Sequence, residues 1–263
     1  MKEREIYPNA PVVLVALEVR HPVSEPLNPS EVRAIKTRLA EHAPIARNSQ
    51  VTNFQVVAGM PTQPTPQIEQ FTRFVNRQST LAVSFRREAL VVETSAYPGW
   101  EQFRQIVSDA VDARMDVAPV DGVERVGLRY VDEIRIPDEA EIDWCQWVSP
   151  SLLGPSPTEP IALQLAQWQG VAVYGSQPGS MLVLRYGPAL GFAIDSSSEL
   201  RREKPADGGP YFLMDIDSFS VPTGSIPEVD RDSLIATCND LHQPVRTLFE
   251  GLIQDKLRDE VLR

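Results

Sequence analysis

The chain has 263 residues, of which 42% are hydrophobic and 23% are charged. This composition is typical of globular proteins, so the chain can bury a sizeable core and global disorder is not expected. The 36 acidic and 25 basic side chains give a net charge of -11, which disfavours nucleic acid and anionic membrane surfaces as partners because both are negative themselves.

The first half of the chain alternates strand and helix patterns. Val12 to Val19 is β-branched and apolar, which predicts a buried strand. A helix is expected after Asn28, because Asn28 can cap it, Pro29 suits its first position and Glu31 can complete a capping box. The remaining predicted elements are strands at Val51–Val57, Leu81–Phe85, Leu90–Thr94 and Val123–Ile136, and an amphipathic helix over Trp100–Val111.

Without one of its strands, this order, β-α-β-β-β-α-β, is the split βαβ arrangement, so we predict an α+β protein whose first half, residues 1–148, is ferredoxin-like. Such sheets are antiparallel and carry their helices on one face. The proline-rich stretch Ser149–Pro160 is typical of a linker, so residues 149–263 are expected to form a second, β-rich unit of antiparallel strands and C-terminal helices. One continuous domain is the alternative.

The second half is predicted to contain more strands and then a long helical segment. Its strand-like runs are Ile161–Tyr174, Met181–Tyr186, Phe192–Ile194 and Tyr211–Phe219, with a polar loop at Ser196–Gly209. Asp230–Leu262 is the strongest helical pattern in the chain, with Asp230 as its cap. Pro244 is expected to kink or split this helix, because proline removes a backbone donor and clashes one turn back.

The sequence lacks the familiar signatures of catalysis. Gly-x-Ser-x-Gly, Ser-x-x-Lys, Walker and Gly-x-Gly-x-x-Gly patterns are all absent, and the three histidines lie far apart along the chain. Cys145 and Cys238 cannot build a disulfide framework or a zinc site, so we expect two free, buried thiols in a reducing cytosol, with one long-range disulfide as the alternative. A charged N-terminus and short apolar runs predict a cytoplasmic protein without a membrane segment, metal or cofactor.

Two strands carry charged residues in alternation, which places like side chains on one face. Arg125 and Arg129 share a face of one strand, and Asp215 and Asp217 share a face of another. We predict a binding or structural network of the residues Arg125, Arg129, Tyr130, Arg185, Asp215 and Asp217. Buried arginines would need carboxylate partners, since an unpaired buried charge is costly. The alternatives are a solvated face, an anion pocket lined by the arginines, and a cation site on the two aspartates.

Several segments together resemble a known family. They are Tyr7–Val12, Tyr97–Phe103, Arg125–Val131, Leu213–Asp217 and Leu248–Glu250. In order, they resemble an uncharacterised bacterial family of roughly this length, sporadically distributed among species and defined by a numbered family model. The family has no established activity, so the resemblance implies no catalytic residues. Its sporadic occurrence is similar to that of horizontally exchanged genes, such as defence, toxin–antitoxin or immunity modules.

These observations favour a non-enzymatic binding or accessory factor, of antitoxin, immunity or defence type, over an enzyme. A basic protein suits its acidic surface as a partner, and a homodimer is compatible with the sequence. Two other functions stay open. One is a metal-dependent enzyme or nuclease that uses Asp215 and Asp217. The other is a small-molecule binding scaffold with Trp144, Trp147 and Trp168 around a cavity.

Overall fold

The computed structural model describes residues 7–54, 66–137, 141–155, 165, 167–175, 179–194, 200–203 and 208–263. The strands are β1 (Val12–Arg20), β2 (Ile45–Phe54), β3 (Pro66–Val75), β4 (Leu81–Phe85), β5 (Ala89–Thr94), β6 (Arg125–Ile134), β7 (Gly170–Gly175), β8 (Gly179–Leu190) and β9 (Pro210–Val221). The helices are α1 (Pro29–Arg38), α2 (Trp100–Val117), α3 (Arg231–Leu252) and α4 (Asp255–Leu257), with short turns at Trp144–Gln146, Pro150–Leu152 and Arg258–Leu262. The predicted α+β class is confirmed.

All nine of these strands belong to one antiparallel sheet, in the order β2-β3-β4-β5-β1-β6-β9-β8-β7. The predicted ferredoxin-like first half is wrong. A split βαβ unit leaves room for one strand between the two that flank its helix, whereas β3, β4 and β5 separate β1 from β2. The sequence analysis missed β3, because Gln70 and Arg73 interrupt its apolar pattern.

The sheet is continuous across the boundary predicted at residues 148 and 149. Strand β6, from the first part of the chain, pairs with β9 from Val126↔Ser220 to Ile134↔Phe212. On its other edge β6 pairs with β1. The strands at the centre of the sheet therefore come from both ends of the chain, and the two parts share one set of hydrogen bonds.

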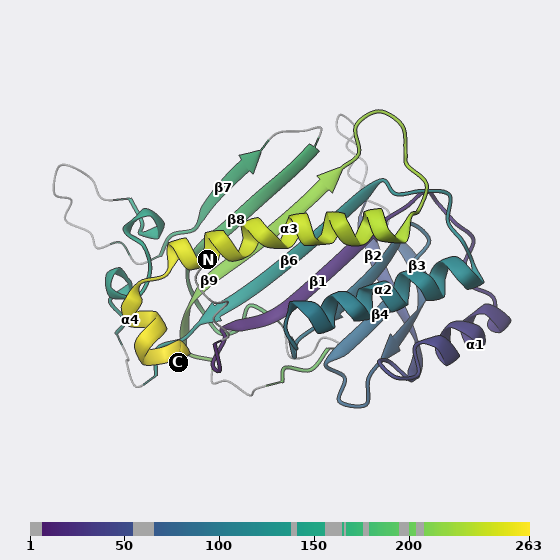
Figure 1. Cartoon of the computed structure of the whole chain (residues 1–263). Helices are drawn as coiled ribbons and strands as arrows, with labels where there is room; N and C mark the ends of the chain where they lie inside the picture. Colours follow the sequence, from purple (N-terminus) through teal and green to yellow (C-terminus); the bar gives the residue numbers. More distant parts are fainter. Residues whose placement is uncertain are drawn as a thin grey trace.

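The three long helices lie on the same face of the sheet (Figure 1). Helix α3 packs on β6 and β9, α2 packs on β5 and α3, and α1 packs on α2 and β2. The core lies between this helical layer and the sheet, where Leu17, Phe74, Phe103, Leu128 and Phe212 are completely buried. Across the described residues, none of the helices is both long and apolar enough to span a bilayer.

Part of the opposite face is covered by the segment around Leu200, which packs against Val75 and Ala82. Arg202 anchors this segment to β6 through two hydrogen bonds of 2.7 Å to Glu133. Burial alone would raise the pKa of Glu133, but hydrogen bonds from Arg202, Arg135 and the Ala193 N–H outweigh it and lower the pKa. The carboxylate is therefore charged at neutral pH and holds the segment in place.

The local signals at both helix starts are confirmed. The Asn28 side chain accepts from the backbone N–H groups of Ser30 and Glu31, and Glu31 accepts from the Asn28 N–H, which completes the capping box. Asp230 caps α3 by accepting from the Ser233 N–H. These contacts form between close neighbours in sequence, which is why the sequence alone could predict them.

The predicted split of this helix at Pro244 is wrong, because α3 continues through it from Arg231 to Leu252. Pro244 and Asp240, whose carbonyl loses its partner, both lie on the exposed side of the helix, where water can replace the missing hydrogen bond. The helix ends eight residues after Pro244, at Leu252. There the Leu252 carbonyl accepts from the Ser149 N–H, and Ile253 forms a β-bridge with Val148.

Two other predicted strands differ in the structure. Phe192–Ile194 is not a strand but a bend, where Phe192 lies against the guanidinium groups of Arg135 and Arg202. Of the run predicted at Ile161–Tyr174, the strand β7 begins only at Gly170, and residues 161–164 and 166 lie outside the described residues. Most of the loop predicted at Ser196–Gly209 also lies outside them.

Candidate anion-binding site

The face of the sheet away from the helices carries a row of arginine–carboxylate pairs. Arg129 donates to both oxygens of Asp215, with distances of 2.7 Å from Nε to Oδ1 and 2.9 Å from Nη2 to Oδ2. Arg185 Nη1 lies 3.5 Å from the same carboxylate. Arg125 bridges Glu18, at 2.9 Å, and Asp217, at 3.4 Å. Five of the six residues predicted as a network therefore lie together on this face.

Gly127 makes room for this arrangement. A Cβ atom at Gly127 would lie 2.5 Å from Nη1 of Arg125, so a side chain there would displace the guanidinium group. Because Gly127 has none, Arg125 can lie back along its own strand and over the ring of Phe219, 4.5 Å from its centroid. The glycine in this segment thus positions the arginine for its two carboxylates.

The network is better suited to stability than to holding a cation. The Asp215 side chain is only 6% exposed, and both of its oxygens already face guanidinium groups. The hydrogen bonds to Asp215 raise the pKa of Arg129 further above its ordinary range. Adjacent positive charges repel a divalent ion, which disfavours the alternative of a metal at Asp215 and Asp217. Among the described residues, no group of three or more potential His, Cys, Asp or Glu ligands gathers.

Tyr130, the sixth predicted residue, lies on the opposite face of β6, under α3. Its hydroxyl is 3.1 Å from the Tyr97 hydroxyl and 3.1 Å from Nδ1 of His242. The His242 ring stacks on Trp100, with centroids 4.3 Å apart. Burial raises the pKa of Tyr97 to about 12, so its hydroxyl keeps its proton at physiological pH. These polar groups join the sheet to α3 rather than extending the arginine network.

Asp132 is an exception among the buried carboxylates. It is 6% exposed, on the same side of β6 as Tyr130, and it makes no hydrogen bond or ion pair within the described structure. Desolvation, with a smaller contribution from the charge of Asp215, raises the pKa of Asp132 to about 7. Asp132 therefore destabilises the fold once it ionises.

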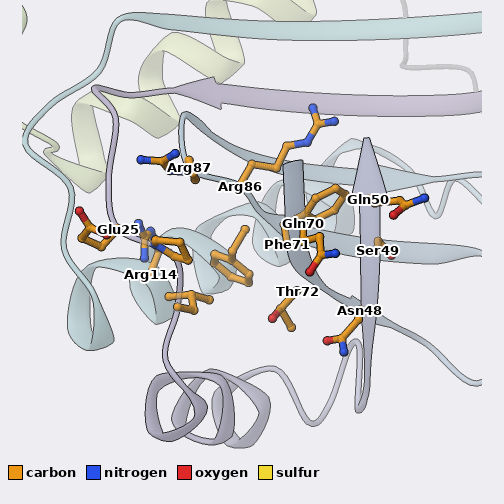
Figure 2. A pocket seen from close by; sticks show the side chains of 13 residues that line it. Glu25, Asn48, Ser49, Gln50, Gln70, Phe71, Thr72, Arg86, Arg87 and Arg114 are labelled. Atoms are coloured by element: carbon orange, nitrogen blue, oxygen red, sulfur yellow. The ribbon is translucent and has the colours of Figure 1, made fainter. Parts of the chain in front are cut away.

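A cavity of about 480 Å³ opens beside the β2 edge of the sheet. Its walls are the middle of β2 and β3, the turn between β4 and β5, the segment before α1, and the C-terminal end of α2 (Figure 2). Side chains from the strands contribute amides and hydroxyls, and Arg86, Arg87 and Arg114 contribute guanidinium groups. This volume is within the usual range for small-molecule sites, roughly 300–1,000 Å³.

Arg114 is the unusual member of this lining. It is only 4% exposed, yet within the described structure its Nε and Nη1 atoms have no hydrogen-bond partner. Its one hydrogen bond, of 2.8 Å, runs from Nη2 to the Ser24 hydroxyl. Burial lowers the pKa of Arg114, opposed by the charge of Glu31, but an arginine keeps its proton in proteins. The cavity therefore adjoins a buried positive charge that, among the described residues, has no carboxylate in ion-pair contact, since Glu31 acts on it only from a distance.

The rim arginines are held near this charge. The Ser24 hydroxyl that accepts from Arg114 donates in turn to the Arg87 carbonyl, at 3.1 Å. The Arg86 guanidinium lies over the ring of Phe71, 5.1 Å from its centroid. Among the described residues of the lining, Glu25, which is exposed, is the only acidic one. The cavity is thus locally cationic although the chain as a whole carries a charge of -11.

A second hollow, of about 650 Å³, lies beside the start of β1 and the end of β6. It is also lined by charged side chains, including Glu133, Arg135 and Arg202. Arg135 and Arg202 both donate to Glu133, and Glu203 also contributes to the lining, so its described residues include two arginines and two carboxylates. The first cavity is the better candidate for a charged ligand.

Sequence reasoning missed Arg114, although a signal was present. The apolar stripe of the second helix runs through Val107, Ala110 and Val111, and Arg114 is the next position at the same three- and four-residue spacing. A charged residue on a buried stripe needs a partner, which is the clue. The other half of the site, on β2 and β3, had no such signal because β3 was not predicted.

The tryptophans proposed to line a cavity do not line either hollow. Trp144 and Trp147 are 8% and 3% exposed and belong to the core, and the Trp168 indole donates to the Leu152 carbonyl. Both cysteines are free thiols, Cys145 exposed and Cys238 buried. The cavity beside Arg114 is polar and is lined by other residues.

No protein-family model and no curated protein matches the chain. The resemblance of its segments to an uncharacterised bacterial family stays a prediction. The geometry of the cavity and of the sheet face is therefore the basis for any statement of function.

The Arg129–Asp215 pair should show energetic coupling. In a double-mutant cycle of Arg129→Ala and Asp215→Ala, measured by urea unfolding, we expect a coupling energy of about 1 kcal/mol or more, because Asp215 is buried although Arg129 is half exposed. The exposed pair Arg38–Asp116 provides the control, with an expected coupling below about 0.5 kcal/mol. Strictly additive effects at Arg129 and Asp215 would show that they do not interact.

Replacement of Asp132 by asparagine should stabilise the protein only at higher pH. The folded pKa, about 7, lies above the ordinary value of 3.8, so the carboxyl destabilises the fold progressively as pH rises from about 4 to 7. At pH 8 we expect Asp132→Asn to increase the free energy of unfolding by at least about 1 kcal/mol. The upper limit of this increase is set by the pKa shift, at about 1.4 kcal/mol for each pKa unit. At pH 4 the two proteins should unfold alike, and an equal gain at both pH values would contradict this account.

Proposed function

We propose that this chain is a non-enzymatic binding protein whose ligand places an anionic group in the cavity beside Arg114. The observation that carries this proposal is the buried guanidinium group with two nitrogens lacking hydrogen-bond partners. In the folded state the group has lost most of its contact with water without gaining a counterion. An anion in the adjoining cavity would supply the missing partner.

An unpaired buried charge and a buried apolar side chain have very different effects on stability. Leaving a charged group buried and unpaired costs several kcal/mol, whereas a hydrophobic side chain of similar size at the same place is often neutral or stabilising. A protein that keeps an arginine there accepts lower stability of the free form. Binding of an anion offsets this cost. The same arginine therefore both destabilises the empty site and contributes to the affinity for the ligand.

The chemistry of the lining favours binding over catalysis. Its polar side chains are arginines, amides and hydroxyls, with Glu25 as the single carboxylate, and neither histidine nor cysteine is among them. Such groups hydrogen-bond and orient a ligand. A nucleophile paired with a base, as covalent catalysis requires, is not assembled by these lining residues.

A second candidate function is binding of a protein partner through β7. Val171 and Val173 on this strand are 66% and 56% exposed, although apolar side chains on a soluble surface are seldom clustered. This is the accessory role that the sequence analysis favoured. Association measured by light scattering, for the wild type and for Val171→Lys with Val173→Lys, tests whether β7 contributes to self-association. If neither the wild type nor the double variant self-associates, a different protein is the remaining partner for this surface.

Removal of the buried charge should separate stability from binding. We expect Arg114→Met to raise the free energy of unfolding of the ligand-free protein by about 1 kcal/mol or more, because it replaces an unpaired buried charge by an apolar side chain. Millimolar inorganic phosphate, at constant ionic strength, should raise the Tm of the wild type and leave that of Arg114→Met unchanged. Thermal and urea unfolding measure both effects.

Arg33→Met is the matched control, because Arg33 is an exposed arginine on α1 and its replacement changes the net charge equally. Its response to phosphate should equal that of the wild type. If Arg114→Met packs badly and unfolds, Arg114→Gln keeps the comparison, since it also lacks the charge. An equal phosphate response in the Arg114 variants and the wild type would refute an anion site at this residue.

A further inference from the structure

The charges around the cavity are unbalanced in a way that specifies the ligand more closely. Among the described residues that line the cavity, three arginines and one glutamate leave an excess of two positive charges. A carboxylate ligand would compensate half of that excess, whereas a dianion would compensate all of it. Arginine also binds tetrahedral oxyanions well, because its planar array of donors matches pairs of their oxygens.

The two ends of the cavity differ in chemistry. In Figure 2, Arg87 and Arg114 lie at one end with Glu25, and the β2 side chains Asn48 and Gln50 lie at the other. Gln70 and Thr72 of β3 lie between these ends. Amides and hydroxyls both donate and accept hydrogen bonds. The part of the cavity lined by β2 and β3 therefore suits an uncharged part of a ligand that also donates and accepts hydrogen bonds. A small ion alone would use only the arginine end.

We infer that the ligand is an organic phosphate monoester. Its dianionic phosphate would lie at the end with Arg87 and Arg114, and its uncharged, hydrogen-bonding remainder would lie along β2 and β3. This inference rests on the proposed anion-binding function and adds the class of ligand. The cavity volume of about 480 Å³ accommodates a phosphorylated sugar or a molecule of similar size.

Arg86 and Arg87 are prepared for such a ligand by contacts that do not use their full donor capacity. The ring of Phe71 supports the Arg86 guanidinium from one side. The Arg87 backbone N–H donates to Glu69, and its Nε atom lies 3.5 Å from the Ser24 carbonyl. Their positions are thus restrained before a ligand arrives, which lowers the entropic cost of binding.

The test compares ligands that share a sugar ring and differ in charge. Glucose 6-phosphate and glucuronate have closely similar rings, but the first carries a dianionic phosphate and the second a carboxylate. By calorimetric titration of the wild-type protein at pH 7.5, we expect glucose 6-phosphate to bind at least about tenfold more tightly, a difference of about 1.4 kcal/mol. Glucuronate binding as tightly as glucose 6-phosphate would overturn the phosphate assignment and leave the anion site intact.

The protonation of the phosphate gives an independent readout. Its second pKa is about 6, so glucose 6-phosphate becomes largely a monoanion at pH 5, and its affinity should fall several-fold. Inorganic sulfate stays a dianion at both pH values and serves as the control for titration of the protein itself. A loss of affinity for glucose 6-phosphate no greater than that for sulfate would contradict binding of the dianion.

The role of the amide end is tested with Gln70→Leu, which removes an exposed amide and leaves the three arginines in place. We expect it to weaken glucose 6-phosphate by about threefold or more, as loss of a hydrogen bond of about 1 kcal/mol would do, and to leave inorganic phosphate unaffected. Equal affinities of the wild type for the two phosphates would overturn the assignment of this end to the ligand. Failure of every anion to bind would instead refute the proposed function itself.

Discussion

The antiparallel pairing of β6 with β9 is the interaction on which the rest of the structure depends. It joins a strand from the first half of the chain to one from the second, over a register that runs from Val126↔Ser220 to Ile134↔Phe212. On one face, this register places Arg129 beside Asp215 and Arg125 beside Asp217. On the other, it provides the surface on which α3 packs. Ion pairs and core thus rest on one set of backbone hydrogen bonds.

Charge is used differently in different parts of the molecule. On the open face of the sheet, carboxylates and arginines compensate one another, and the buried Asp215 is held by Arg129 and Arg185. Around the cavity at the other end of the sheet, Arg114 is buried without a compensating carboxylate. A net charge of -11 therefore says little about either place. The local balance decides which surface can receive an anion, because interactions between charges weaken steeply with distance and solvent.

The order of strands explains why the ferredoxin-like prediction failed. Most of the individual strands were recognised, but β3 was not, since its apolar residues Ile68, Phe71 and Phe74 recur at every third position instead of alternating. With β3 present, β2 to β5 form a meander that returns to β1, and β2 becomes an edge of the sheet. The same omission concealed the cavity, because β3 forms one of its walls. One missed strand thus changed both the topology and the candidate site.

The sequence by itself determined the α+β class, the capping box at Asn28, the cap at Asp230 and the alternation that places Arg125 with Arg129 and Asp215 with Asp217. These features depend on contacts between residues close together in the chain, or on the period of a strand. Only the tertiary structure decided that the two charged strands are neighbours, that Tyr130 faces away from them, and that Arg114 lacks a counterion. Those outcomes depend on which distant strands pair and on which side chains then come into contact. The local sequence pattern specifies neither.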